Sequence, residues 1–330
     1  MNDDILWVYV GTYTQGDSKG IYLGELDLEL GRLHSFRLAG EATQPSFLAL
    51  HPTRPLLYAV NETDHFRGQN SGGISAFSIQ SGTGVLSLIN QQPTHGATPC
   101  HLNLDALGSC VLVANYGGGS IASFPIHADG SLEEAVCFIQ HEGCSIHPRQ
   151  RTPHAHGIHN DATGQFIFVP DLGIDKILIY RFDSKSCCFV PHDSASARVA
   201  SGSGPRHLAF HPYERFAYVV NELNSTVTSF TYNPDGGNLE SFQTVPTLPE
   251  EFKSKNATAE IEVHPSVVTC IRKGAGARGK LGNHLAANKS PTGGAGTCGA
   301  KNGWENDLQP KGLFQAMPRS SRGCLFFYLV

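Results

Sequence analysis

Short apolar runs at strand spacing, separated by turns rich in Gly, Pro and Asp, recur along the first 266 residues. The clearest example is GPRHLAFHPYERFAYVVNE, from Gly204 to Glu222. Its apolar positions fit two strands that flank a His-Pro turn: Leu208, Phe210, Phe216, Tyr218 and Val220. None of the related segments has the apolar spacing of an amphipathic helix. The pattern therefore predicts repeated strand–turn–strand units.

Four other segments repeat this unit. They are QPSFLALHPTRPLLYAVNE (44–62), TPCHLNLDALGSCVLVANY (98–116), TPHAHGIHNDATGQFIFVPDL (152–172) and the shorter AEIEVHPS (259–266). The opening prolines at 45, 99, 153 and 205 are 54, 54 and 52 residues apart. A period of this size with strand content is typical of a propeller in which each repeat forms one blade. We therefore predict an all-β fold, a β-propeller of four-stranded blades.

Further strands complete each unit. Third strands are expected at 73–79, 120–126, 176–182 and 226–232, and turns such as Asp129-Gly130 lead to a fourth, outer strand. Residues 5–14 match the second strand of the later copies. The inner strand of that first blade must come from elsewhere, and in a closed ring the C-terminal end of the chain supplies it.

The repeat is lost after Ser266. Residues 267–330 carry nine Lys and Arg against two Asp and Glu, a net charge of +7 that leaves −12 for residues 1–266. Gly is dense there and strand alternation is absent. We predict a propeller-like domain over 1–266, with about five blades, and a disordered or aberrant Gly-rich basic tail over 267–330. A shifted reading frame or an altered splice would explain the change, and scattered charges argue against a nucleic-acid-binding arm.

Composition narrows the classes of function. The net charge of −5 at pH 7 gives no reason to expect nucleic acid or an anionic membrane surface as a partner. No apolar run is long enough to span a bilayer. The N-terminal residues show no secretory signal, so we expect a cytoplasmic protein whose nine cysteines are free thiols. The oligomeric state is left open.

Polar residues gather where the strands of a propeller would meet at one mouth of its channel. At each predicted blade they occupy the start of the first strand or the end of the second: Ser46, Asn61, Glu62, His101, Asn115, Tyr116, His154, His156, Asp171, Arg206, His207, Asn221, Glu222 and Glu260. One such residue alone is best read as a polar cap on a strand end. Agreement among four copies favours a polar pocket.

The segment Pro153–His159 also invites a metal interpretation. His154 and His156 would share one strand face at a spacing that zinc can use. The sequence fixes no third ligand, so we predict neither a metal nor another cofactor. A metal-free role in acid–base chemistry is favoured instead.

The ordered motifs resemble the seven-bladed β-propeller lactonase family. They are YVGTYT, LHPTRPLLYAVNE, VANYGGGSI, TPHAHG, VPDLGIDKI, GPRHLAFHP, VVNE and AEIEVHP, and they cover roughly residues 5–266. The resemblance implies an active site at the channel mouth with catalytic His154 (or His156), Arg206 and Glu222. From the polar positions at the channel mouth we predict that six further residues bind substrate: His101, His156, His207, Asn115, Asp171 and Asn221. The chain departs from the family after AEIEVHP, where a second strand ending in Asn-Arg-Gly and two further blades would follow. We find no counterpart of these elements, of a later Arg that the resemblance implies for substrate binding, or of the inner strand that closes the ring.

The resemblance implies a hydrolase of carbohydrate metabolism, similar to the 6-phosphogluconolactonases of the pentose phosphate pathway. Glu222 or His154 would take a proton from water, and the water would attack the lactone carbonyl. Arg206 would stabilise the oxyanion or bind a substrate phosphate. Two alternatives stay open: a non-catalytic propeller that binds a protein or metabolite, and an inactive truncated homologue.

Overall fold

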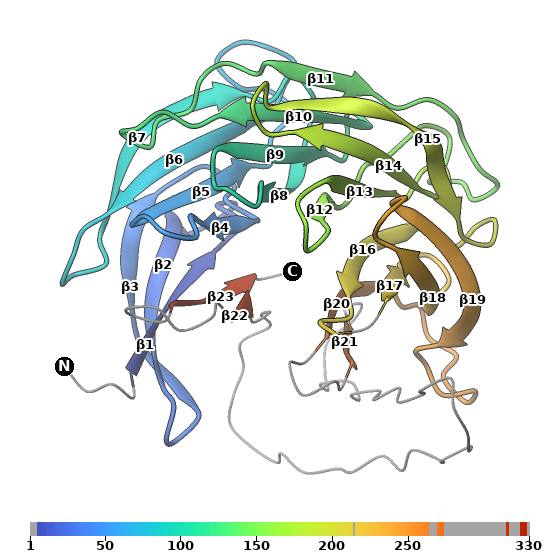
Figure 1. Cartoon of the computed structure of the whole chain (residues 1–330). Helices are drawn as coiled ribbons and strands as arrows, with labels where there is room; N and C mark the ends of the chain where they lie inside the picture. Colours follow the sequence, from blue (N-terminus) through green and yellow to red (C-terminus); the bar gives the residue numbers. More distant parts are fainter. Residues whose placement is uncertain (1–4, 214, 264–268, 274–314, 317–323, 329–330) are drawn as a thin grey trace. The chain divides into compact units, whose positions relative to one another are not determined.

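The computed structural model describes residues 5–213, 215–263, 269–273, 315–316 and 324–328 (Figure 1). Its regular elements within these ranges are all β-strands, which confirms the predicted all-β class. In this part of the chain no helix is long and apolar enough to cross a membrane. The chain divides into two compact units, which are described separately: residues 1–141, 182–190 and 311–330 form the first, and residues 142–181 and 191–310 form the second.

The first unit holds three sheets, and in two of them four antiparallel strands follow one another in chain order. One of these sheets consists of β4 (Leu48–Leu50), β5 (Leu56–Asn61), β6 (Gly73–Ile79) and β7 (Leu86–Pro93). The other consists of β8 (Pro99–Leu104), β9 (Cys110–Asn115), β10 (Ser120–Pro125) and β11 (Cys137–Gln140). Each sheet corresponds to one predicted blade.

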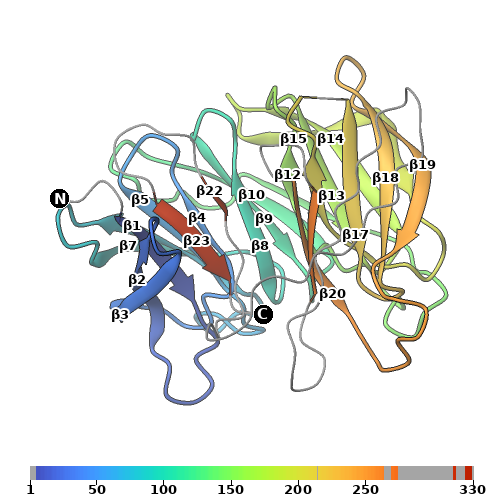
Figure 2. The same cartoon turned by 90° about the horizontal axis from the view of Figure 1, so that it is seen from below.

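The remaining sheet of the first unit is mixed. Its strands are β1 (Ile5–Gly11), β2 (Gly20–Asp27), β3 (Arg32–Glu41), β22 (Gln315–Ala316) and β23 (Cys324–Tyr328), in the order β22-β23-β1-β2-β3. Figures 1 and 2 show β23, in red, beside β1. A C-terminal segment thus lies along the inner edge of β1, although the sequence shows no counterpart of the strand that closes the ring. It does so in parallel register, with Trp7 opposite Cys324, whereas the inner strands β4 and β8 run antiparallel to their neighbours.

The second unit continues the series. One four-stranded antiparallel sheet consists of β12 (His159–Asn160), β13 (Phe166–Asp171), β14 (Lys176–Asp183) and β15 (Cys188–Arg198). The next consists of β16 (Pro205–Phe210), β17 (Phe216–Asn221), β18 (Thr226–Asn233) and β19 (Asn238–Pro246). A hairpin of β20 (Thr258–Val263) and β21 (Thr269–Lys273) follows, and β20 lies along β16. Residues 182–190, around the β14–β15 turn, are counted with the first unit.

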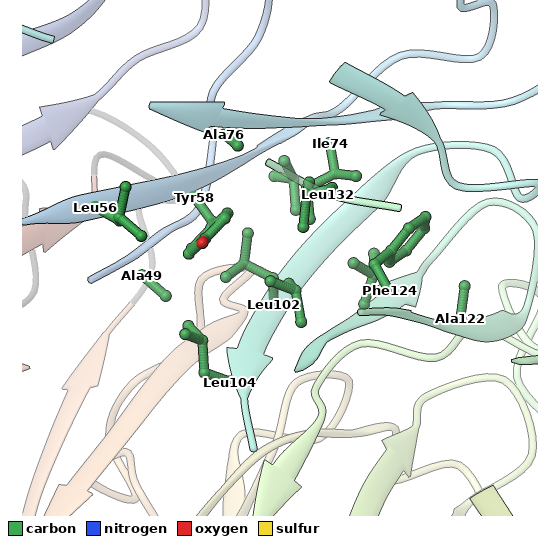
Figure 3. Packing of buried hydrophobic residues seen from close by; sticks show 13 residues of the cluster. Ala49, Leu56, Tyr58, Ile74, Ala76, Leu102, Leu104, Ala122, Phe124 and Leu132 are labelled. Carbon is green, nitrogen blue, oxygen red and sulfur yellow. The ribbon is translucent and has the colours of Figure 1, made fainter. Parts of the chain in front are cut away.

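Apolar side chains pack between neighbouring sheets of each unit. In the first unit, Tyr58 and Leu56 of β5 meet Leu102 of β8 and Phe124 of β10 in one buried cluster (Figure 3). In the second unit, Phe168 of β13 packs among residues of β16 to β18 in the same way. The second strands β5, β9 and β13 are buried along their whole length.

The predicted tail contains the strands β21, β22 and β23, although its sequence shows no strand alternation. The fifth copy therefore extends through Lys273 as a hairpin, beyond the point where the repeat pattern fails. The other residues of 267–330 lie outside the described residues. The division of the chain at Ser266 stays a prediction.

A β-bulge recurs at the start of three inner strands. Register shifts occur between Pro99 and His101, between Pro205 and His207, and between Thr258 and Glu260. One residue is inserted at each place, and such an insertion redirects side chains at the end of a strand. In β16 the inserted residue is Arg206, so the bulge decides where its guanidinium points.

Candidate functional site

The backbone register identifies equivalent positions in four copies of the repeat. The residue after each second strand donates its N–H to a carbonyl that precedes the first strand: Glu62 to Gln44, Tyr116 to Thr98, Leu172 to His154, and Glu222 to Gly204. Gln44, Thr98 and Gly204 share the left-handed conformation, with φ of 48°, 45° and 64°. His154 therefore occupies the position of Gly204, and His156 occupies the position of Arg206.

This register corrects the sequence alignment of the fourth copy, which was based on the position of Pro153. Pro153 stands two residues earlier than Pro99 and Pro205 relative to the strands. The inner strand of this blade is short, with the pair His159–Asn160 and one isolated bridge between Ala155 and Asp171. His154 and His156 therefore flank a single bridge residue and lie outside a regular strand.

In the second unit, Arg206, Glu222 and His156 meet in one cluster. Arg206 Nε lies 3.2 Å from Glu222 Oε2, and His156 Nε2 lies 3.6 Å from the same oxygen. All three side chains are nearly buried, each about 10% exposed. Arg206 comes from the bulge of β16 and Glu222 follows β17, so one hairpin supplies both. His156 comes from the preceding copy.

A second arginine contacts the same carboxylate. Arg149 Nη1 lies 2.6 Å from Glu222 Oε1, and the Arg149 side chain is 46% exposed. Both oxygens of Glu222 therefore receive a guanidinium, one from a buried arginine and one from a half-exposed arginine. Charge-assisted contacts of this kind are among the strong hydrogen bonds in proteins.

A buried histidine–glutamate pair supports Arg206 from the other side. His207 Nδ1 lies 2.6 Å from Glu260 Oε2, and His207 Nε2 lies 3.4 Å from Arg206 Nη1. Arg206 Nη1 also donates to the carbonyl of Ala259, the residue in the bulge of β20. A proton on Nδ1 that faces Glu260 leaves Nε2 to accept from the guanidinium. Glu260 and His207 thus hold Arg206 in its orientation toward Glu222.

Burial shifts the titration of this cluster. Burial, and then the charge of Arg206, holds the pKa of His156 and of His207 well below the usual value. Burial lowers the pKa of His159, whose ring lies 5.9 Å from that of His207, to about 3. Burial raises the pKa of Glu260 to about 7. The imidazoles are therefore neutral near pH 7, when one unprotonated ring nitrogen can accept a proton.

Asp175 fixes the loops that carry the two arginines. Its Oδ1 accepts from Gln150 Nε2 and from the Gly204 N–H, both at 2.8 Å. Its Oδ2 accepts from Ser145 Oγ and from the Gly202 N–H. Gln150 follows Arg149, and Gly204 lies two residues before Arg206. One carboxylate therefore sets the positions of both guanidiniums.

Several residues predicted to bind substrate make hydrogen bonds within their own blade. Asn221 Nδ2 donates to the hydroxyls of Thr226 and Thr228, at 2.9 and 3.0 Å. Asp171 Oδ1 accepts from the N–H groups of His154 and Gly173. Both residues are fully buried. These contacts give them a structural role, and their contact with substrate stays a prediction.

Two further predicted residues belong to the first unit. Asn115 is buried and donates to the carbonyl of Thr94 and the hydroxyl of Ser120. His101 is buried against Phe47, with ring centroids 4.0 Å apart. The cluster in the second unit is described by itself, and substrate binding by His101 and Asn115 stays a prediction.

Sequence reasoning missed Arg149 as a site residue. It lies in the loop 142–150, outside the strand-end positions from which the candidates were chosen. The available signal was its position four residues before Pro153, in a run with Gln150 and Arg151 that immediately precedes the histidine segment. Among the described residues no group of three or more His, Cys, Asp or Glu could hold a metal ion. The absence of a metal and of other cofactors stays a prediction.

Comparison with known proteins gives consistent results. A family model described as "Lactonase, 7-bladed beta-propeller" matches residues 7–272. A 6-phosphogluconolactonase of Bacillus subtilis (strain 168) is 38% identical over 255 residues, which cover 77% of this chain and 70% of that protein. The match confirms the predicted propeller architecture.

Solved structures agree with this match. The structure of a periplasmic gluconolactonase of Pseudomonas aeruginosa matches with a TM-score of 0.75 and 31% identity. The match covers 82% of this chain and 76% of the gluconolactonase chain. A protein of Bacteroides fragilis NCTC 9343, provisionally titled a 6-phosphogluconolactonase, has a TM-score of 0.75 and 33% identity, with 82% and 75% coverage.

Proposed function

The chain belongs to the seven-bladed β-propeller lactonases, and on that premise we propose that it hydrolyses a sugar lactone to the open hydroxy acid at the Arg206–Glu222–His156 cluster. The convergence of these three side chains, from positions far apart in the sequence, carries the proposal. A guanidinium, a carboxylate and a neutral imidazole suffice to activate water and to stabilise an oxyanion.

Each group has a defined task in this reaction. The neutral imidazole of His156 takes a proton from water, and the water oxygen forms a bond to the lactone carbonyl carbon. The carbonyl oxygen becomes an oxyanion next to the N–H donors of Arg206. The ring C–O bond then breaks, the leaving oxygen takes the proton from His156, and the product is a hydroxy acid. Glu222 aligns Arg206 and His156, because both lie beside its Oε2.

This assignment differs from the sequence-based one in its histidine. His154 was the first choice, but His156 lies beside Glu222, whereas His154 Nε2 lies 3.5 Å from Thr152 Oγ1. Catalysis by Arg206 and Glu222 is retained in the proposal. Their contacts support it.

The test is a purified-protein assay with 6-phosphogluconolactone and with glucono-1,5-lactone, after subtraction of spontaneous hydrolysis. We expect turnover of at least one lactone, a loss of about 100-fold or more in His156→Gln and in Glu222→Gln, and near-normal rates in His154→Gln. The His154 variant is the matched control, since it removes the same side chain two residues away. No turnover above the spontaneous rate would favour the non-catalytic propeller or the inactive homologue. Normal rates in His156→Gln would refute the choice of histidine.

The names of the relatives guide two finer proposals. The similarity to a 6-phosphogluconolactonase favours a phosphorylated sugar lactone and a place in the pentose phosphate pathway. It also fits the expected cytoplasmic location, although one similar structure is of a periplasmic gluconolactonase. Fractionation of the native host with an antibody against this protein tests the location.

A further inference from the structure

The two arginines around Glu222 have different environments. Arg206 is nearly buried, and its guanidinium contacts Glu222, His207 and the carbonyl of Ala259. The Arg149 side chain is 46% exposed and reaches the same carboxylate from the loop 142–150. Arg206 is therefore a fixed component of the cluster, whereas Arg149 presents positive charge to the solvent next to the reacting groups.

The pair between Arg149 and Glu222 is half-exposed at its arginine end only, since the side chain of Glu222 is about 10% exposed and that of Arg149 is 46% exposed. Water and salt screen the exposed guanidinium. The loop that carries Arg149 is firmly placed. Gln150, fully buried, donates to the Leu172 carbonyl at 2.7 Å and to Asp175 Oδ1 at 2.8 Å. The structure thus holds a half-exposed guanidinium at the site on a fixed stretch of chain.

The chemistry of a guanidinium suits recognition of an anion. Arg carries five N–H donors in a planar fork that matches the oxygens of phosphate and carboxylate groups. The chain as a whole carries a net charge of −5, which disfavours the approach of an anionic substrate. A local positive group at the site offsets this repulsion.

The names of two similar proteins indicate two kinds of lactone substrate. One is a 6-phosphogluconolactonase and the other a gluconolactonase. Their named substrates differ by one phosphate group. A residue that contacts this group would decide between the two classes of lactone.

We propose that Arg149 is the specificity-determining residue of the site, and that it binds the anionic group of a phosphorylated lactone. This inference rests on the lactonase function proposed above. The phosphate approaches from the solvent side and shares the Arg149 guanidinium with Glu222. Arg206 remains in contact with Glu222 and acts on the carbonyl oxygen. A neutral lactone makes no use of Arg149.

The decisive experiment measures kcat and KM of the full-length protein and of Arg149→Ala with 6-phosphogluconolactone and glucono-1,5-lactone. A lost charge-assisted contact raises KM for the phosphorylated lactone about 10- to 100-fold. We expect the kcat/KM for the neutral lactone to fall by a much smaller factor, because Arg149 then acts only through its contact with Glu222. Arg149→Lys keeps a charge without the fork and should give an intermediate KM. Arg151→Ala, an exposed arginine of the same stretch, is the charge-matched control and should resemble the unmodified protein.

The outcomes are distinct. Equal losses on both lactones would overturn the inference and would mean that Arg149 acts by orienting Glu222. Unchanged constants on both would also overturn it. Calorimetric titration with 6-phosphogluconate and gluconate gives a readout that does not need turnover. If no lactone is hydrolysed but Arg149→Ala weakens binding of 6-phosphogluconate alone, the proposed function fails and the anion site stands. If neither acid binds in an Arg149-dependent way, the anion site fails.

Discussion

Two blades, one from each unit, share a backbone but differ in chemistry. The sheets β8–β11 and β16–β19 both begin with a left-handed residue, Thr98 or Gly204, and both have a β-bulge after the opening proline. The residue in the bulge is Cys100 in the first and Arg206 in the second. The backbone geometry is thus the same in both blades. The residue in the bulge differs, and only Arg206 places a positive charge there.

The end of the second strand shows the same contrast. Asn115 and Asn221 are fully buried, and each amide bonds to a hydroxyl on the next strand, that of Ser120 or Thr226. The following residue is Tyr116 in one blade and Glu222 in the other. A structural amide therefore stands beside a position that varies between the two blades, and the carboxylate proposed for catalysis occupies the variable position.

The largest effect is expected at the two bulges. Arg206→Ala should lower kcat/KM about 100- to 1,000-fold, because a donor to the oxyanion is removed. Cys100→Ala, at the equivalent position, should change it less than about three-fold. Lactone assays on both variants provide the measurement, and denaturant unfolding checks that each variant is folded. Similar rates for the two variants would remove the distinction between the blades.

The amides at the strand ends are expected to matter for stability. Asn221→Ala and Asn115→Ala should each lower the free energy of unfolding by about 1–3 kcal/mol, since buried hydroxyl and carbonyl groups lose a partner. Urea unfolding at constant pH measures this. A raised KM for the lactone in Asn115→Ala, without a loss of stability, would instead support the sequence-based prediction that this residue binds substrate.

Substitution at the left-handed position should affect stability by different amounts in the two blades. A Cβ at Gly204 would lie 2.5 Å from Leu223 Cγ, so Gly204→Ala should destabilise the fold by about 1–3 kcal/mol. Thr98→Gly relieves the left-handed strain but removes the hydrogen bond from the Gly117 N–H to Thr98 Oγ1, so its net effect should be within about 1 kcal/mol. Equal melting midpoints for the two variants would contradict this expectation.

The smallest effect concerns pH. His159 occupies the position that Ala209 has in the next blade, and burial lowers its pKa to about 3. The unfolded chain binds a proton at this residue near pH 6.5, so the contribution of the neutral ring is complete above that pH and is lost as pH falls toward 3. His159→Ala should flatten the fall in unfolding free energy by at most about 1.4 kcal/mol per pH unit. Urea midpoints at pH 7.0 and 5.5 measure the slope. Part of the pH dependence should remain in this variant, because the pKa values of His156 and His207 are also lowered.

The fold followed from the sequence because a repeated strand–turn–strand pattern of fixed period allows few architectures. The register within the fourth copy could not be predicted in the same way, because Pro153 lies two residues earlier relative to the strands than the prolines of the other copies. As a result, the sequence alignment put His154 at the position that His156 occupies. The sequence shows an amide at each of two strand ends, Asn115 and Asn221, but not the hydroxyls that these amides contact. Their structural contacts could therefore not be predicted, and their contact with substrate stays a prediction.

Arg149 was not predicted for a related reason. Its loop has no counterpart in the repeat, so no comparison among copies could align it with Glu222. The pairing of Glu260 with His207 likewise depends on how β20 lies along β16. Contacts of this kind come from the packing of one blade on the next, which periodicity alone does not specify.

The carboxylate of Asp175 has a consequence for how such a site can change over time. It accepts hydrogen bonds from Gln150, next to Arg149, and from Gly204, two residues before Arg206. One side chain therefore helps to position both guanidiniums. A substitution there would displace both arginines together, and separate adjustment of either would require a new anchor. Variation in substrate choice should therefore proceed by exchange of the residue type at 149, with the loop that bears it kept in place.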